Sequence, residues 1–360
     1  MEFLTSRIKQ YLSDPQVVIL GVFLIVGTLL VIGLGKYLTP VIAALVIAYL
    51  LEGVVGRLER RGVPRLLGTL LVLAAFVVVL VFILFGLAPL VSRQVAQLVQ
   101  QLPTWVSMGR DALMQLPEKY PQFITQGQVE GFIDSLGNEL ALAGQRAVTW
   151  SLASVSNAIT LVIYLVIVPI MVLFFLKDKL LMLEWLGHYL PRERELTNRV
   201  FRKVDLQIGN YIRGKALEIL IVYAVSQAVF SLMGLQFATL LAVVVGLSVI
   251  VPFIGAAVVT IPVALVAYFQ WGASMEFVWL MVAYLIVQVL DGNVLVPVLF
   301  SEVVDLHPIA IIVAVLLFGG LWGFWGVFFA IPLATLVQAV LQALPAFDKD
   351  EQPPPDAPAL

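Results

Sequence analysis

Long apolar runs alternate with short polar segments along this chain, and several runs are long enough to cross a membrane. A spanning helix needs about 20 mostly apolar residues. Residues 16–35, 66–91, 152–176 and 216–235 reach this length, and 41–51 does so when the residues before it are included. The run at 16–35 is too long for the apolar core of a signal peptide and lacks a small-x-small cleavage site, so it predicts a retained anchor. The pattern predicts an all-α, polytopic transmembrane bundle.

The segment 236–269 is apolar throughout but is interrupted by Pro252, Gly255 and Pro262. Two straight helices within it would each rise about 24 Å, which is less than the ~30 Å thickness of the hydrocarbon core. We therefore expect a broken hairpin or a pair of short helices in this segment.

A second interrupted segment, 309–344, contains Gly319 and Gly320 near its centre. Irregular backbone at membrane depth is tolerated where protein buries it or where it lines a water-filled cavity. Two such segments predict broken or re-entrant helices around a pathway, with a gate at Pro252, Gly255, Pro262, Gly319 and Gly320. The alternative is that these residues make kinks that serve only helix packing.

The polar segments predict the domain organisation. Apolar residues in 92–150 recur every three or four positions, which predicts amphipathic helices outside the bilayer. Basic residues concentrate near the termini, in 52–65 and in 177–215, and such residues mark the cytoplasmic side. Both termini are therefore predicted to be cytoplasmic. The predicted parts are N-terminal transmembrane helices 1–3 (1–91), an extracytoplasmic insert (92–150), transmembrane helix 4 (151–176), a cytoplasmic basic amphipathic segment (177–215), a C-terminal core of broken helices (216–345) and a disordered cytoplasmic tail (346–360).

Composition supports a membrane protein and excludes several functions. The chain is 61% hydrophobic and 12% charged, whereas soluble domains carry about 25% charged residues. The net charge of −2, with no basic block among aromatics, argues against a nucleic-acid partner. With no cysteine and no recognisable hydrolase or nucleotide-binding motif, we expect neither an enzyme nor a bound cofactor. The expected partner is the lipid bilayer.

The carboxylate of Asp291 lies inside the apolar run 277–300. An ionised carboxylate near the bilayer centre costs about 2.5–3.5 kcal/mol, so it should face the bundle interior, titrate or bind a cation. Gly292 permits an unwound backbone, the Asn293 amide can donate and accept, and Pro297 frees a carbonyl one turn earlier. The cluster predicts a helix break that binds Na⁺ or a proton. Alternatively, it is a polar kink bonded to a neighbouring helix, or the end of the span.

Four further residues complete the predicted pathway. Gln288 lies one turn before the aspartate, and the imidazole of His307 can exchange a proton near neutral pH. His307 also precedes a proline, so it is equally suited to cap a helix start. Arg213 and Lys215 are predicted at the cytoplasmic mouth, where they would bind an anion or lipid headgroups, or simply extend their charges to the membrane surface.

Five sequence blocks together resemble the autoinducer-2 exporter family of bacterial membrane proteins, which includes the PerM-type permeases. The blocks are Tyr211-Ile212-Arg213-Gly214-Lys215, Val251-Pro252-Phe253-Ile254-Gly255 with Pro262, Asp291-Gly292-Asn293 with Pro297, Leu306-His307-Pro308, and Gly319-Gly320 to Gly326 with Pro332. The resemblance implies about eight helices, a location in the bacterial inner membrane and assembly into a homo-oligomer. The family often has Glu or Gln where Asp291 stands.

These features predict a permease that moves a small hydrophilic solute, such as autoinducer-2, or a cation. The absence of a nucleotide motif favours secondary transport, with coupling to Na⁺ or H⁺, over a primary pump. Two alternatives remain open: a scaffold that presents residues 92–150 to a partner, and a channel-like homo-oligomer.

Overall fold

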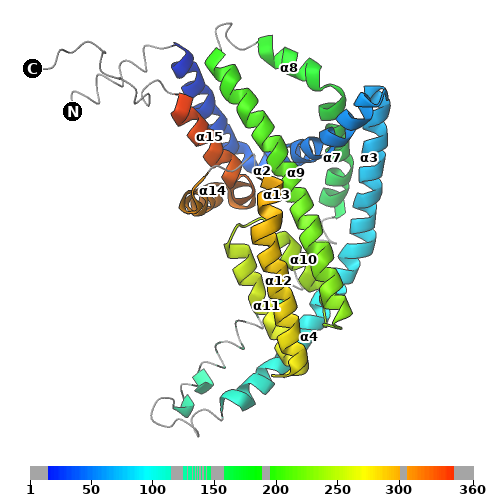
Figure 1. Cartoon of the computed structure of the whole chain (residues 1–360), viewed down its shortest axis with the longest axis vertical. Coiled ribbons are helices and arrows are strands. Elements are labelled where there is room, and N and C mark those ends of the chain that lie inside the picture. Colours follow the sequence, from blue (N-terminus) through cyan, green and yellow to red (C-terminus); the bar gives the residue numbers. More distant parts are fainter. Residues whose placement is uncertain are drawn as a thin grey trace, which may run out of the picture. The chain divides into compact units, whose positions relative to one another are not determined.

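The computed structural model describes residues 15–114, 158–188, 195–300 and 306–343, with scattered positions between 125 and 146. Within these residues the secondary structure is helical, which confirms the all-α prediction (Figure 1). The chain forms two compact units. The first contains Met1–Thr39, Asp178–Gly214 and Phe300–Leu360, and the second contains Pro40–Lys177 and Lys215–Leu299. The predicted tail, 346–360, lies outside the described residues.

Helix α2, Pro15–Arg60, is continuous over 46 residues and contains Pro40. The sequence predicted two helices separated near this proline, and that prediction is wrong. A proline inside an apolar helix removes one backbone hydrogen bond, and in a membrane protein neighbouring helices and small local adjustments make this tolerable. An unwound segment would have left several backbone groups without partners.

The next helical stretch also continues across a predicted boundary. Helix α3, Arg65–Phe82, passes through a π-helical turn, η1 (Ile83–Leu87), into α4, Ala88–Leu113. Pro103 lies inside α4, which continues past it. The apolar stripe of α4 packs on the core of the second unit, so the start of the predicted insert belongs to that core. The contacting residues of α4 are Val91, Val95, Leu98 and Trp105.

A small cluster in the second unit joins α2, α3 and α7, Ala158–Lys177. Val55, Val72 and Val172 are buried in it. Arg65 connects the ends of all three helices, because its guanidinium donates to the Leu176 carbonyl oxygen at 2.7 and 3.1 Å and pairs with Glu52 at 3.2 Å. This bidentate contact satisfies a carbonyl at the end of α7, where helical partners run out.

The basic segment comprises α8, Lys179–His188, and the beginning of α9, Glu195–Leu232. Helix α9 is continuous over 38 residues. The basic amphipathic segment predicted at 177–215 therefore continues without a break, within α9, into the span that follows it.

The interrupted segment 236–269 forms the predicted hairpin. Helix α10, Ala238–Ser248, has 11 residues and rises about 16 Å, so it is too short to span the bilayer. A turn at 249–253 leads into α11, Ile254–Trp271, which contains Pro262. A Cβ at Gly255 would overlap the Ser248 carbonyl oxygen, so glycine is what allows the close approach of the two helices.

Helix α12, Met275–Leu290, begins at Ser274, whose hydroxyl accepts a hydrogen bond from the Phe277 N–H at 3.4 Å. It continues through a π-helical turn, η2 (Asp291–Leu295), into α13, Val296–Phe300. The core of the second unit lies among α9, α10, α11 and α12, where Phe230, Val245, Val263, Leu280 and Tyr284 are fully buried (Figure 1).

In the first unit, α14, Pro308–Phe328, packs against α15, Ala330–Ala343. Gly323 has φ 60° and kinks α14, as the glycine-rich sequence predicted. A Cβ at Gly326 would overlap the carbonyl oxygen of Phe318, so the chain folds back closely on itself here. In both interrupted segments, a glycine therefore lies against a backbone carbonyl from earlier in the chain.

Among the described residues, six helices are long and apolar enough to cross a membrane: Tyr37–Arg60, Arg65–Arg110, Val204–Leu232, Ile254–Trp271, Met275–Phe300 and Pro308–Phe328. The polytopic prediction is confirmed in this form. Helix α10 is shorter than any of the six.

Candidate functional site

A buried ion pair lies inside the second unit. The Lys215 ammonium is 2.7 Å from the Glu218 carboxylate, and their side chains are 5% and 3% exposed. Both residues belong to the Val204–Leu232 span of α9. Lys215 was predicted at the cytoplasmic mouth, where it would bind an anion or lipid headgroups or extend its charge to the membrane surface. In the structure it is instead enclosed by protein, so that prediction is corrected.

The ammonium of Lys215 also donates a hydrogen bond to the Val249 carbonyl oxygen at 2.9 Å. Val249 is the C-cap of α10, where carbonyl groups lack helical partners and the helix dipole favours a positive charge. The C-terminal ends of half-helices hold coupling cations in several transporter folds. Here a lysine side chain supplies the cation.

A third charged group, Asp291, lies near this pair. It is half-buried at the first residue of η2, and its charge interacts with those of Lys215 and Glu218. Its Oδ1 atom is buried without a hydrogen-bond partner among the described residues. The structure therefore brings two carboxylates, one ammonium and one helix-terminal carbonyl together from α9, the end of α10 and η2.

The backbone at Asp291 differs from the predicted helix break. The Val296 N–H donates to the Asp291 carbonyl oxygen, a bond typical of a π-turn, so the helix widens and continues. In this way it accommodates Pro297 without opening the backbone to the bilayer. Such π-bulges occur frequently at functional sites.

Asn293 does not join Asp291 in a ligand set. Its side chain is exposed and its Nδ2 donates to the Val289 carbonyl oxygen of its own helix at 2.9 Å. Gly292 and Pro297 are also exposed. The predicted cluster of carboxylate, amide and freed carbonyl is therefore replaced by one carboxylate that faces residues of other helices.

A row of polar side chains on α12 leads to Asp291. The Tyr284 hydroxyl is hydrogen-bonded to Thr260 of α11 at 3.2 Å and also to Gln288, one turn later. Tyr284 is fully buried. Tyr284, Gln288 and Asp291 are spaced so that they share one face of a helix. Gln288 was predicted from the sequence, but Tyr284 and Thr260 were not, although the spacing of Tyr284, Gln288 and Asp291 was visible there.

Glu218 was given no role from the sequence, because a carboxylate at a helix end is tolerated. A lysine followed three residues later by a glutamate, inside a span, was the available signal, because such a pair can form within one helix turn. The basic residues before Lys215 instead favoured a surface interpretation.

The remaining candidates lie elsewhere. His307 is exposed and its Nδ1 accepts a hydrogen bond from the Ile309 N–H at 3.3 Å, so it caps α14. Arg213 donates to the Asn210 side chain at 2.8 Å. Gly319 and Gly320 belong to the first unit, in α14.

The predicted gate in the hairpin does adjoin the site. Pro252 and Gly255 lie in the turn and first helical turn that follow Val249, the acceptor of the Lys215 hydrogen bond. Pro262 lies further along α11, two residues after Thr260. Among the described residues, no group of three or more His, Asp or Glu side chains could hold a metal ion.

Comparison with known proteins agrees with this architecture. A family model described as "AI-2E family transporter" matches residues 17–346. "Putative permease PerM" of Escherichia coli (strain K12) is 44% identical over 345 residues, which cover 96% of this chain and 98% of that protein. "AI-2 transport protein TqsA" of the same organism is 23% identical over 330 residues, which cover 90% of this chain and 92% of TqsA. With a matching model over nearly its whole length, six candidate spans and a charged site within two of them, the chain belongs to the AI-2E transporter family.

Proposed function

We propose that this permease is a secondary transporter in which Asp291 accepts and releases the coupling proton. The proposal rests on a buried carboxylate oxygen of Asp291 that has no hydrogen-bond partner within the described part of the chain and lies beside the Lys215–Glu218 ion pair. The substrate would be a small hydrophilic solute that crosses the bilayer through the second unit.

The three charged groups differ in how well they are compensated. Each charge placed at the bilayer centre costs about 2.5–3.5 kcal/mol unless it is paired. Glu218 is paired with Lys215 at 2.7 Å, and Lys215 has a second partner in the Val249 carbonyl. Asp291 interacts with the same lysine without a hydrogen bond to it. Asp291 is therefore the group best suited to change its protonation state during transport.

The position of Lys215 favours a proton over a sodium ion. A sodium site needs several oxygen atoms directed at one point, and the carbonyl oxygen of Val249 is already bound to the lysine ammonium. The lysine takes the place that a mobile cation would occupy at the end of a half-helix.

The relatives supply candidates for the solute. TqsA is named for transport of AI-2, and we take this autoinducer as the first substrate to test. We further propose that the chain lies in a bacterial inner membrane with both termini in the cytoplasm, supported by its basic segments, and that it assembles as a homo-oligomer.

The test is solute uptake into proteoliposomes under an imposed pH gradient or an imposed sodium gradient. We expect the parent to accumulate solute only with the pH gradient, Asp291→Asn to lose this dependence, and Asp291→Glu to retain part of it. Asn293→Ala is the matched control, because that exposed residue lies in the same π-turn. Unchanged gradient-driven uptake in Asp291→Asn would refute the role of Asp291, and uptake driven by sodium alone would refute the proton.

A further inference from the structure

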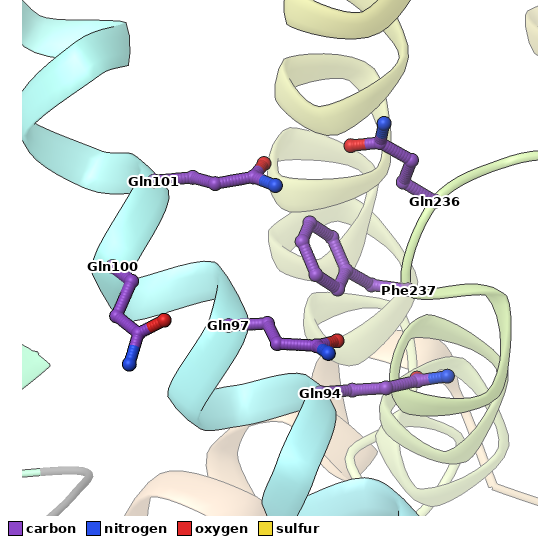
Figure 2. Close-up of a pocket in the computed structure, with 6 residues that line it drawn as sticks. All are labelled: Gln94, Gln97, Gln100, Gln101, Gln236 and Phe237. Atoms are coloured by element: carbon purple, nitrogen blue, oxygen red, sulfur yellow. The ribbon is translucent and has the colours of Figure 1, made fainter.

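A second polar site lies at the opposite end of α10 from Lys215. It is a pocket of about 350 Å³ lined by Gln94, Gln97, Gln100 and Gln101 of α4 and by Gln236 and Phe237, which precede α10. Figure 2 shows Gln94, Gln97 and Gln101 directed from α4 toward Gln236 and Phe237, whereas the Gln100 amide is directed away. None of the six lining side chains is charged.

Most of the amide groups are available for a ligand. Gln94 uses its Oε1 atom to accept a hydrogen bond from the Leu240 N–H at 2.7 Å, in the first turn of α10. Within the described part of the chain, the side chains of Gln97, Gln101 and Gln236 make no hydrogen bond. Each free amide offers two donors and an acceptor.

The wall opposite α4 is held rigidly. The side chain of Gln270, from α11, accepts a hydrogen bond from the Gln236 N–H at 2.7 Å and donates to the Gly234 carbonyl oxygen at 2.8 Å. Trp105 contacts the Phe237 ring edge-on at 6.5 Å between centroids and stacks on Phe269 at 4.9 Å. A preorganised wall of this kind reduces the entropy lost when a ligand binds.

Phe237 itself has a strained backbone. Its φ of 57° and ψ of 27° lie in the left-handed region, which a bulky side chain rarely adopts. Such strain persists where the surrounding structure over-determines it, and it is concentrated at functional sites. Here the strained residue places an aromatic ring within a surface of amides.

We infer that this pocket binds a small uncharged solute that carries several hydroxyl groups. Hydroxyl groups both donate and accept, as amides do, and the apolar faces of such a solute fit against an aromatic ring. A charged solute would find no opposite charge among the six lining side chains. A single dehydrated ion would leave most of the 350 Å³ empty, because even a water molecule occupies only about 30 Å³. The inference rests on the proposed transport function and gives the class of solute.

One helix joins this pocket to the ion pair. Phe237 is the N-cap of α10 and Val249 is its C-cap, so solute contacts and the Lys215 hydrogen bond lie about 18 Å apart along one helix. A displacement of α10 would therefore change the geometry of both the pocket and the Lys215 site.

Binding of ribitol, an uncharged polyol, to the full chain in nanodiscs tests the inference, with saturation-transfer NMR as the readout. We expect ribitol to bind and lactate, sodium and ethylammonium not to compete. Gln97→Leu combined with Gln101→Leu should raise the ribitol Kd about tenfold or more, since two sets of hydrogen bonds are lost. Gln126→Leu, at an exposed glutamine that does not line the pocket, is the matched control and should change it less than twofold.

Two further variants make the outcome unambiguous. Gln97→Glu keeps the shape of the side chain and should also weaken ribitol binding, which excludes a general effect of leucine on folding. Asp291→Asn should bind ribitol as the parent does, so a failure of the proton proposal leaves this result unaffected. Absence of ribitol binding to the parent, competition by sodium, or equal losses in the Gln126 and Gln97/Gln101 variants would overturn the inference.

Discussion

The ammonium of Lys215 and the carboxylate of Glu218 form an ion pair at 2.7 Å within α9, with both side chains almost fully buried. Removing two charges from water costs several kcal/mol per ion, and their attraction returns that energy only with good geometry and additional hydrogen bonds. The bond from Lys215 to the Val249 carbonyl oxygen supplies one such addition. A pair this costly in a transporter span points to function rather than to stability.

Breaking the pair should therefore cost more than removing it. We expect Lys215→Met or Glu218→Leu alone to destabilise the protein by about 3–5 kcal/mol, because each leaves one buried charge uncompensated. The double variant should recover most of that loss. Unfolding in detergent measures the difference between the single and double variants.

Solute uptake by the double variant distinguishes a role of the pair in transport from a role in stability. We expect a folded protein without gradient-driven transport. Full transport by the double variant would show that the pair serves only the fold.

The hydroxyl of Tyr284 should matter for transport more than for folding. Tyr284→Phe removes one hydrogen-bonding group, which costs about 0.5–1.5 kcal/mol, while Thr260 keeps its bond to the Ala256 carbonyl oxygen at 2.8 Å. If the row from Thr260 to Asp291 conducts protons, gradient-driven uptake should fall severalfold in vesicles. Tyr268→Phe is the control, since Tyr268 is exposed on the adjacent helix α11. Equal uptake by the two variants would contradict a role for the row.

Of two glycines in the same region, only one should lose stability when a methyl group is added. Gly255→Ala forces a Cβ into the Ser248 carbonyl oxygen and should destabilise the protein by about 1–3 kcal/mol or more, as overpacked cores do. Gly292→Ala meets no atom within 4 Å and should leave the Tm of the detergent-solubilised protein nearly unchanged. A Tm unaffected by Gly255→Ala would show that α10 and α11 can separate.

Arg65 should not be replaceable by lysine. Its planar guanidinium contacts the Leu176 carbonyl twice and reaches Glu52 and Glu59, a geometry that one ammonium cannot reproduce. We expect Arg65→Lys to lower the unfolding free energy by about 1–3 kcal/mol. Arg61→Lys, at an exposed position nearby, should have no measurable effect. Comparable losses in both variants would indicate that general charge, not this geometry, stabilises the ends of α2, α3 and α7.

Local residue chemistry predicted the interrupted helices well. The apolar segment 236–269 is interrupted by Pro252 and Gly255 and was too short for two spans. The structure forms a short helix and a longer one there. The length of an element and the thickness of a bilayer are enough for such an inference.

The site itself depended on contacts that one sequence does not display. Pro40 and the Asp291 cluster predicted breaks, but the chain keeps its helices continuous through a proline and a π-turn because lipid offers backbone groups no alternative partner. The burial of Lys215 depends on where α10 ends, at Val249, thirty-four residues later in the chain. Periodicity along α9 could not reveal that acceptor.

If Asp291 is the coupling group, the ion pair also limits how much charge the proposed transport cycle can move. Lys215 and Glu218 cancel each other, so the net charge of the three groups is that of Asp291 alone: minus one when ionised, zero with a proton bound. Moving one elementary charge across a membrane potential of 100 mV changes the energy by about 2.3 kcal/mol. A rearrangement of these helices would therefore be nearly indifferent to voltage when Asp291 carries its proton and voltage-sensitive when it does not. An electrical recording of the transport cycle would then report the occupancy of a single carboxylate.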